Sequence, residues 1–233
     1  MSSLPDVTFL YGRARALGSP TAGDPMNTVM IERGCFLGLA TSAIEAYNRE
    51  TNGFVLGNEG TRTIRARPRT ITVLRAAYPL QTEDRKPNWV SHGNERAFRR
   101  ARGAVENLDV GYRVLGGFHS HTGDDGDANL SPTDLDYVAD ELRRIGRTRE
   151  PDGAAWLEVV LALRRRTWTR PHDVGWTPRR YKRKLGCTLA ITPDQGFDMT
   201  IGGYWVHARP DGSPGRWDVT GTEEATLVLP WSV

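Results

Sequence analysis

Two histidines separated by a single residue, His119 and His121, are the side chains of this sequence best placed to bind a metal ion. They follow Gly116-Gly117-Phe118 in a segment that reads as a strand, and residues i and i+2 of a strand project from the same face. Asp134 follows in the first turn of an expected helix. Two imidazoles and one carboxylate leave the fourth tetrahedral position of a zinc ion open for water, as catalytic zinc requires.

Each of these features also has an ordinary structural explanation. A single His-x-His can consist of two exposed histidines that bind nothing. Ser131-Pro132-Thr133-Asp134 has the N-cap, N1 and N3 residues that many helices prefer. A hydrolytic zinc site also needs a base, and the chain contains no His-Glu-x-x-His helix that would supply one. Glu50 is the best candidate, in the stretch Glu50-Thr51-Asn52-Gly53-Phe54-Val55-Leu56-Gly57.

Taken together, these residues resemble the JAMM (MPN+) family of zinc metalloproteases. The family pattern is a glutamate shortly before a Gly-x-x-x-Gly strand, then His-x-His, a loop, and Ser-x-x-Asp. The elements occur here in that order, with Glu50 before Gly53 and Gly57, then the two histidines, and then Ser131 and Asp134. The resemblance covers roughly residues 29 to 163 and extends to the strands expected after Leu185.

The resemblance implies a role for each residue. His119, His121 and Asp134 would ligate one Zn²⁺ ion, Glu50 would take a proton from its bound water, and Ser131 would stabilise the oxyanion. The implied activity is a deubiquitinase-like isopeptidase that cleaves the amide or isopeptide bond at the C-terminus of a ubiquitin-like or sulfur-carrier protein. Deconjugation from lysine and precursor processing both remain open. A non-catalytic MPN-type scaffold is the alternative, and the intact ligand set argues against it.

The sequence departs from the family pattern beside the second histidine. Thr122 stands where the family usually has proline, and the acidic connection from His121 to Ser131 is somewhat longer than usual. Both changes bear on the substrate groove and leave the ligands in place. Calcium is a poor fit to this connection, because counting from Asp125 as the first EF-hand position puts Leu130 where glycine is required.

Several periodic segments are expected to position these residues. Helices are expected over residues 36–47, ending near Glu50, over 94–108 and over 131–145. Strands are expected at 54–56, 112–119, 156–163, 185–192, 197–208 and 226–229, and within residues 61–78 at 63–64 and 70–74, where Pro68 interrupts the pattern. Their loose alternation predicts an α/β (α+β) protein with a mixed, mostly antiparallel sheet. The resemblance further implies one curved MPN-like domain with cytidine-deaminase-like layering.

The composition of the 233-residue chain is that of a globular protein, with 38% hydrophobic and 25% charged residues. Residues 1–27 read as a flexible N-terminal extension, and residues 28–233 as the catalytic domain. Neither a signal peptide nor a membrane-spanning run is visible, so we expect a cytoplasmic protein. Cys35 and Cys187 are isolated, which predicts two buried thiols rather than a disulfide framework.

The net charge of +3 conceals one strongly basic segment. Residues 164–184 contain nine Lys and Arg residues against the single acid Asp173, and Trp168 and Trp176 are interleaved with them. We interpret the segment as an insertion that could contact an acidic partner or a nucleic acid. A solvated loop between two strands is the alternative.

Overall fold

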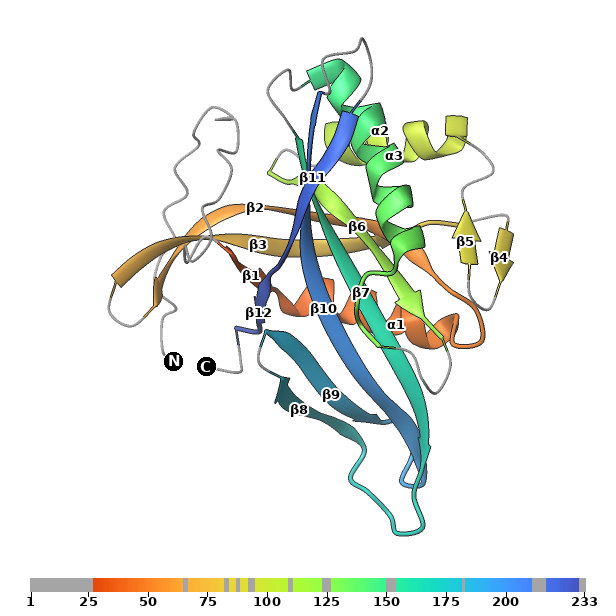
Figure 1. Ribbon diagram of the computed structural model, residues 1–233. Helices are drawn as coiled ribbons and strands as arrows, with labels where there is room; N and C mark the ends of the chain where they lie inside the picture. Colours follow the sequence, from red (N-terminus) through yellow and green to blue (C-terminus); the bar gives the residue numbers. More distant parts are fainter. Residues whose placement is uncertain are drawn as a thin grey trace.

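The described part of the protein is built on one large curved β-sheet with three helices against it (Figure 1). The computed structural model describes residues 27–64, 67–81, 84–86, 89–91, 95–108, 111–122, 127–149, 154–181, 183–210 and 217–230. The helices are α1 (Arg33–Glu45), α2 (Glu95–Leu108) and α3 (Pro132–Arg149). The strands of the large sheet are β1 (Thr28–Ile31), β2 (Asn52–Ile64), β3 (Arg67–Pro79), β6 (Arg113–His121), β7 (Ala154–Thr167), β8 (Gly175–Tyr181), β9 (Lys184–Ala190), β10 (Gln195–Pro210), β11 (Trp217–Glu224) and β12 (Thr226–Val228).

The sheet is mixed and mostly antiparallel. Its order is β12-β1-β3-β2-β6-β7-β10-β9-β8, and β11 pairs with β10 outside this path. Within the described chain the parallel pairs are β1 with β12, β1 with β3, and β6 with β7. A separate hairpin is formed by β4 (Asp84–Lys86) and β5 (Trp89–Ser91). The expected α+β class with a mixed, mostly antiparallel sheet is therefore confirmed.

The two faces of the sheet carry two different cores. Val55, Phe118 and Leu157 pack with buried residues of α1, whereas Phe54 and Trp156, their sequence neighbours, pack with Val138 and Leu142 of α3. Because successive strand residues point to opposite faces, α1 and α3 must cover opposite sides of the sheet. The face covered by α3 is the one that receives His119 and His121.

The first helix is shorter at its C-terminal end than the sequence predicts. α1 ends at Glu45, and residues 46–49 form turns, so the expectation that the helix continues to Glu50 is wrong. Tyr47 accounts for the misjudged end. Its ring packs on Phe197 with centroids 5.0 Å apart, so Tyr47 contacts the core although it lies in a turn. In the sequence, its apolar ring therefore continues the helical spacing of α1 beyond the true end of the helix. The helices expected at 94–108 and 131–145 correspond to α2 and α3.

The basic segment, residues 164–184, is largely part of the sheet. It comprises the end of β7, a connection, β8 and the first residue of β9, so the solvated-loop alternative is wrong for its strand residues. On β8 the pleat puts Trp176 and Arg179 on opposite faces of the sheet. Trp176 packs on Phe36, with ring centroids 5.3 Å apart, whereas Arg166 and Arg179 act on Asp198 from the other face.

The remaining sequence expectations fall partly outside the described residues. The predicted extension, residues 1–27, is described only at Asn27, and the acidic connection between His121 and Ser131 only at Thr122 and from Asp127 onward. Cys35 and Cys187 are both buried and form no disulfide, as expected. In the part of the chain that is described, every helix is too short or too polar to cross a bilayer.

Candidate metal centre

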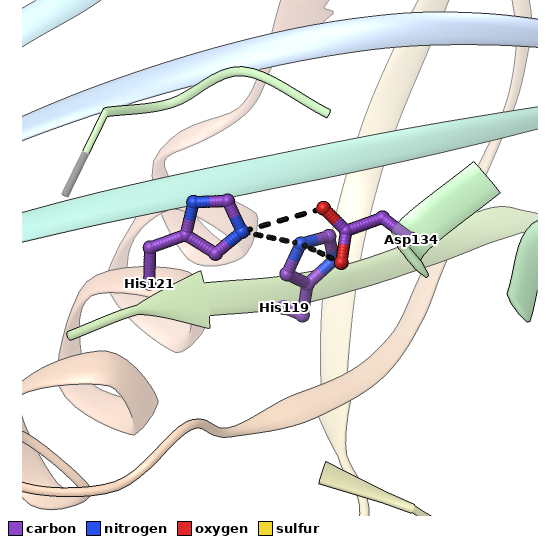
Figure 2. A group of neighbouring side chains, drawn as sticks. All are labelled: His119, His121 and Asp134. Carbon is purple, nitrogen blue, oxygen red and sulfur yellow. Dashed lines mark hydrogen bonds and ion pairs between the residues drawn. The ribbon is translucent and has the colours of Figure 1, made fainter. Parts of the chain in front are cut away.

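Three side chains meet where β6 ends and α3 begins, as Figure 2 shows. His119 and His121 project from β6, and Asp134 projects from the first turn of α3. One ligand atom from each lies within 4.8 Å of the others. The Nε2 atoms of the two histidines are 3.1 Å apart. His119 Nε2 lies 3.4 Å from Asp134 Oδ1, and His121 Nε2 lies 3.4 Å from Asp134 Oδ2. The sequence prediction that these three residues converge is confirmed.

The other ring nitrogen of each histidine has its own partner. His119 Nδ1 lies 2.7 Å from the Glu158 carboxylate, and His121 Nδ1 lies 2.8 Å from the backbone carbonyl of Asp127. A carboxylate and a carbonyl accept hydrogen bonds, so Nδ1 carries the hydrogen in both rings. Each Nε2 is therefore the nitrogen directed at the shared space, as in metal-binding histidines whose second nitrogen is held by an outer partner.

Asp134 is held in place by the local structure of the helix start. Its backbone N–H donates to Ser131 Oγ at 3.2 Å, and the Ser131 N–H donates to Asp134 Oδ2 at 2.7 Å. This reciprocal pair is a capping box with aspartate in the place of glutamate. The helix start expected from the sequence therefore also fixes the carboxylate. Ser131 accepts a hydrogen bond at its hydroxyl oxygen, which leaves the hydroxyl hydrogen able to donate.

Electrostatic coupling within the group is strong. Burial opposes ionisation, yet the contacts of His119 with Asp134 and Glu158 raise the pKa of this histidine to about 10. Burial also opposes ionisation of Asp134, and both imidazoles together hold its pKa well below the usual range. The pKa of His121 is raised by Asp134, against the effect of burial. The three side chains thus favour positive charge between them, and a metal ion would compete with a proton for the same donor atoms.

Glu50 lies beside this group, in the connection between α1 and β2. The Ser120 N–H donates to the Thr51 carbonyl at 2.9 Å, and the Thr51 N–H donates to Ser120 Oγ at 3.0 Å. Asn52 pairs with His119 in the antiparallel pairing of β2 and β6, and these two bonds extend that pairing to Thr51 and Ser120. The next residue on each side is Glu50 and His121, which therefore lie opposite each other. Burial raises the pKa of Glu50; the two histidines oppose this shift, and Asp134 adds to it.

Glu158 is a site residue that the sequence analysis missed. It lies on β7 opposite Gly117 and is only 1% exposed, so its carboxylate depends on buried partners. His119 and the indole N–H of Trp156, 2.7 Å away, supply them. A side chain at position 117 would collide with the Glu158 carboxylate, which lies 2.9 Å from where its Cβ would stand. The available signal was one acid inside the apolar run of residues 156–163.

Comparisons with known proteins do not assign a family. No protein-family model matches the sequence, and no curated protein matches it. Among solved structures, the chain resembles the solution structure of protein DSY2949 from Desulfitobacterium hafniense, with 14% identity and a TM-score of 0.41. The alignment covers 87% of this chain and 92% of that one. A likeness of this size carries no conclusion about function.

Proposed function

We propose that this protein is a zinc-dependent hydrolase of the JAMM (MPN+) type. It would cleave the amide or isopeptide bond at the C-terminus of a ubiquitin-like or sulfur-carrier protein. The observation that carries the proposal is the convergence of His119, His121 and Asp134 on one space, with Glu50 beside them. The proposal includes an MPN-like domain over residues 28–233, with cytidine-deaminase-like layering, and a cytoplasmic location.

The donor set fits zinc. A tetrahedral zinc ion about 2.0 to 2.1 Å from its ligands holds neighbouring ligand atoms about 3.3 Å apart. The separations here are 3.1 Å between the two Nε2 atoms, 3.4 Å from His119 Nε2 to Asp134 Oδ1, and 3.4 Å from His121 Nε2 to Asp134 Oδ2. Two neutral imidazoles with one carboxylate form a three-ligand set of the catalytic type, which leaves one coordination position for water or substrate.

Each surrounding side chain then has a chemical task. A zinc ion held by His119, His121 and Asp134 would supply Lewis-acid chemistry and would lower the pKa of a water molecule to about 7. Glu50 accepts the proton of the attacking water and returns it to the leaving amine. The Ser131 hydroxyl donates to the carbonyl oxygen of the substrate as negative charge develops there. Glu158 and the Asp127 carbonyl keep the two imidazoles in the ligating tautomer.

The substrate class comes from the family resemblance. A ubiquitin-like protein ends in an extended tail, and such a tail can add to the edge of a sheet and bring its last carbonyl to the metal. A nucleic-acid-binding role for residues 164–184 has less support: it rests on composition, and within the segment Arg166 is engaged with Asp198 while the exposed Trp176 ring packs on Phe36. The second alternative, a scaffold without turnover, leaves the complete set of ligands and base unexplained.

The test combines metal analysis with cleavage of a ubiquitin-like fusion protein. We compare the wild type with Glu50→Gln and His121→Ala. Glu50→Gln should retain zinc and lose about 10²- to 10⁴-fold in turnover, because general acid–base catalysis contributes on this scale. His121→Ala should lose both zinc and turnover. Glu45→Gln, which changes a carboxylate at the end of α1, is the matched control and should keep both properties.

The outcomes separate the parts of the proposal. Undiminished turnover in Glu50→Gln would remove Glu50 as the base. A wild-type protein without stoichiometric metal would remove the metal centre. The remaining outcome is a wild type that binds zinc and yet cleaves neither a ubiquitin-like protein with a C-terminal extension nor one conjugated to lysine. That result would remove the substrate class and leave the metal centre in place.

A further inference from the structure

Residues 127–131, which lead from the metal centre into α3, are folded by their own side chains. The Asn129 N–H donates to Asp127 Oδ1 at 2.9 Å, and the Asn129 amide donates to Asp127 Oδ2 at 2.5 Å. Ser131 then caps α3. Asp127 also offers its backbone carbonyl to His121 Nδ1. The position of this segment therefore decides the orientation of one metal-binding imidazole.

Tyr204 fastens this segment to the sheet. Tyr204 lies on β10, which is two strands away from β6, the strand that carries the histidines. Its hydroxyl donates to the Ala128 carbonyl at 2.6 Å and lies 3.1 Å from Asn129 Oδ1. Burial, followed by the charges of Glu224 and Asp127, raises the pKa of Tyr204 to about 12, so the hydroxyl keeps its hydrogen. The segment is thus tied to the sheet at a second point.

Two further residues complete the attachment. A side chain at Gly202 would place its Cβ only 2.3 Å from the Ala128 carbonyl, so glycine is needed for the segment to approach β10 this closely. The Lys184 ammonium donates to Asn129 Oδ1 and lies 5.9 Å from the centre of the Tyr204 ring, within cation–π range. Lys184 is the last residue of the basic segment, which therefore reaches the surroundings of the metal centre.

We propose that Tyr204 and Lys184 are positioning residues for the metal centre. They hold residues 127–129 against β10, so that the Asp127 carbonyl keeps His121 in the ligating tautomer and orientation. This inference rests on the metal centre of the proposed function and is independent of the substrate. Outer partners of metal-binding histidines typically change metal affinity by about 10- to 100-fold. Since Tyr204 acts through the Asp127 carbonyl, we expect an effect at the lower end of this range.

The experiment measures metal affinity in matched hydroxyl deletions. Tyr204→Phe removes the contact to Ala128 and keeps the ring. Tyr47→Phe removes a hydroxyl that accepts a hydrogen bond from the Arg165 N–H at 3.3 Å, and the Tyr47 ring packs on the core of the α1 face, opposite the metal ligands. Each purified full-length variant is titrated with Zn²⁺ against a chelator, and the absorption spectrum of its Co²⁺ form is recorded. Thermal unfolding of the metal-free proteins measures the purely structural loss.

We expect Tyr204→Phe to bind Zn²⁺ about tenfold more weakly and to show an altered Co²⁺ spectrum. Tyr47→Phe should match the wild type in both measurements, even if both variants unfold at a similarly lowered temperature. Lys184→Met should weaken binding in the same direction, with Arg183→Met as its control, because Arg183 contacts the Glu224 carbonyl instead. Because Lys184→Met keeps the Tyr204 hydroxyl, it tests the attachment even if Tyr204→Phe folds poorly.

Equal zinc affinities and equal Co²⁺ spectra in Tyr204→Phe and Tyr47→Phe would overturn the positioning role. In that case a zinc-binding, active wild type would leave the proposed function standing. A wild type that binds neither Zn²⁺ nor Co²⁺ would overturn the metal centre itself, and the positioning role with it.

Discussion

The two faces of β6 carry very different kinds of side chain. Phe118 and Ser120 point to the face covered by α1, and Phe118 is fully enclosed there among apolar residues. His119 and His121 point to the α3 face, where each ring nitrogen has a polar partner. One strand of alternating residues therefore provides the core on one face and the candidate metal ligands on the other.

The comparison shows how differently the two faces are specified. On the core face, close packing sets the requirement, and a residue of similar volume and polarity can be accepted. On the site face, Glu158 and the Asp127 carbonyl each have one hydrogen-bonding task, and a residue of similar size does not perform it. Core substitutions should thus change stability first, and site substitutions should change metal binding first.

The largest change in stability is expected from Phe118→Ala. It removes a buried aromatic ring that also fills the space beside Gly53. Loss of such a ring typically lowers the free energy of unfolding by about 3 to 5 kcal/mol. Denaturant unfolding with a chelator present measures this loss in the metal-free protein. His121→Ala should lose much less under the same conditions, and an equal loss would contradict the separation of the two faces.

An intermediate effect is expected from Glu158→Gln. The amide is similar in size but carries no charge, and it can serve only one of the two donors, His119 Nδ1 and Trp156 Nε1, as an acceptor. Zinc affinity should fall by about 10- to 100-fold, measured by competition with a chelator. Asp198→Asn is the control, since this carboxylate contacts Arg166 and Thr188 instead. Similar affinities in both variants would show that Glu158 acts only in packing.

The smallest effect is expected from Ser131→Ala. The variant loses the N-cap of α3, which typically costs about 1 kcal/mol of stability. Thermal unfolding measures the cap, and turnover of the ubiquitin-like fusion measures the proposed donor role. Ser131→Thr keeps a hydroxyl and should restore both properties. If turnover in Ser131→Ala is unchanged while stability falls, Ser131 is a cap alone.

Most elements of the fold could be predicted because their signals are local. Periodic apolar residues gave α2 and α3, and runs of branched and apolar residues gave β6, β7, β9 and β10, within a few residues of their bounds. The end of α1 was misplaced because Tyr47 contacts the core through Phe197, a partner remote in sequence. The strands of the basic segment were also missed because of partners elsewhere in the chain: the end of β7 pairs with β10, and β8 pairs with β9.

The sequence by itself determined which donor atoms are available and part of their geometry. The spacing of His119 and His121 puts them on one face of any strand, and Ser131 with Asp134 forms a cap at the start of any helix. Only the tertiary structure brought β6 to α3, Glu50 to the level of His121, and Glu158 and Tyr204 to the support of the site. The physical reason is range: side-chain direction and capping are set within a few residues, whereas strand pairing joins positions far apart in the chain.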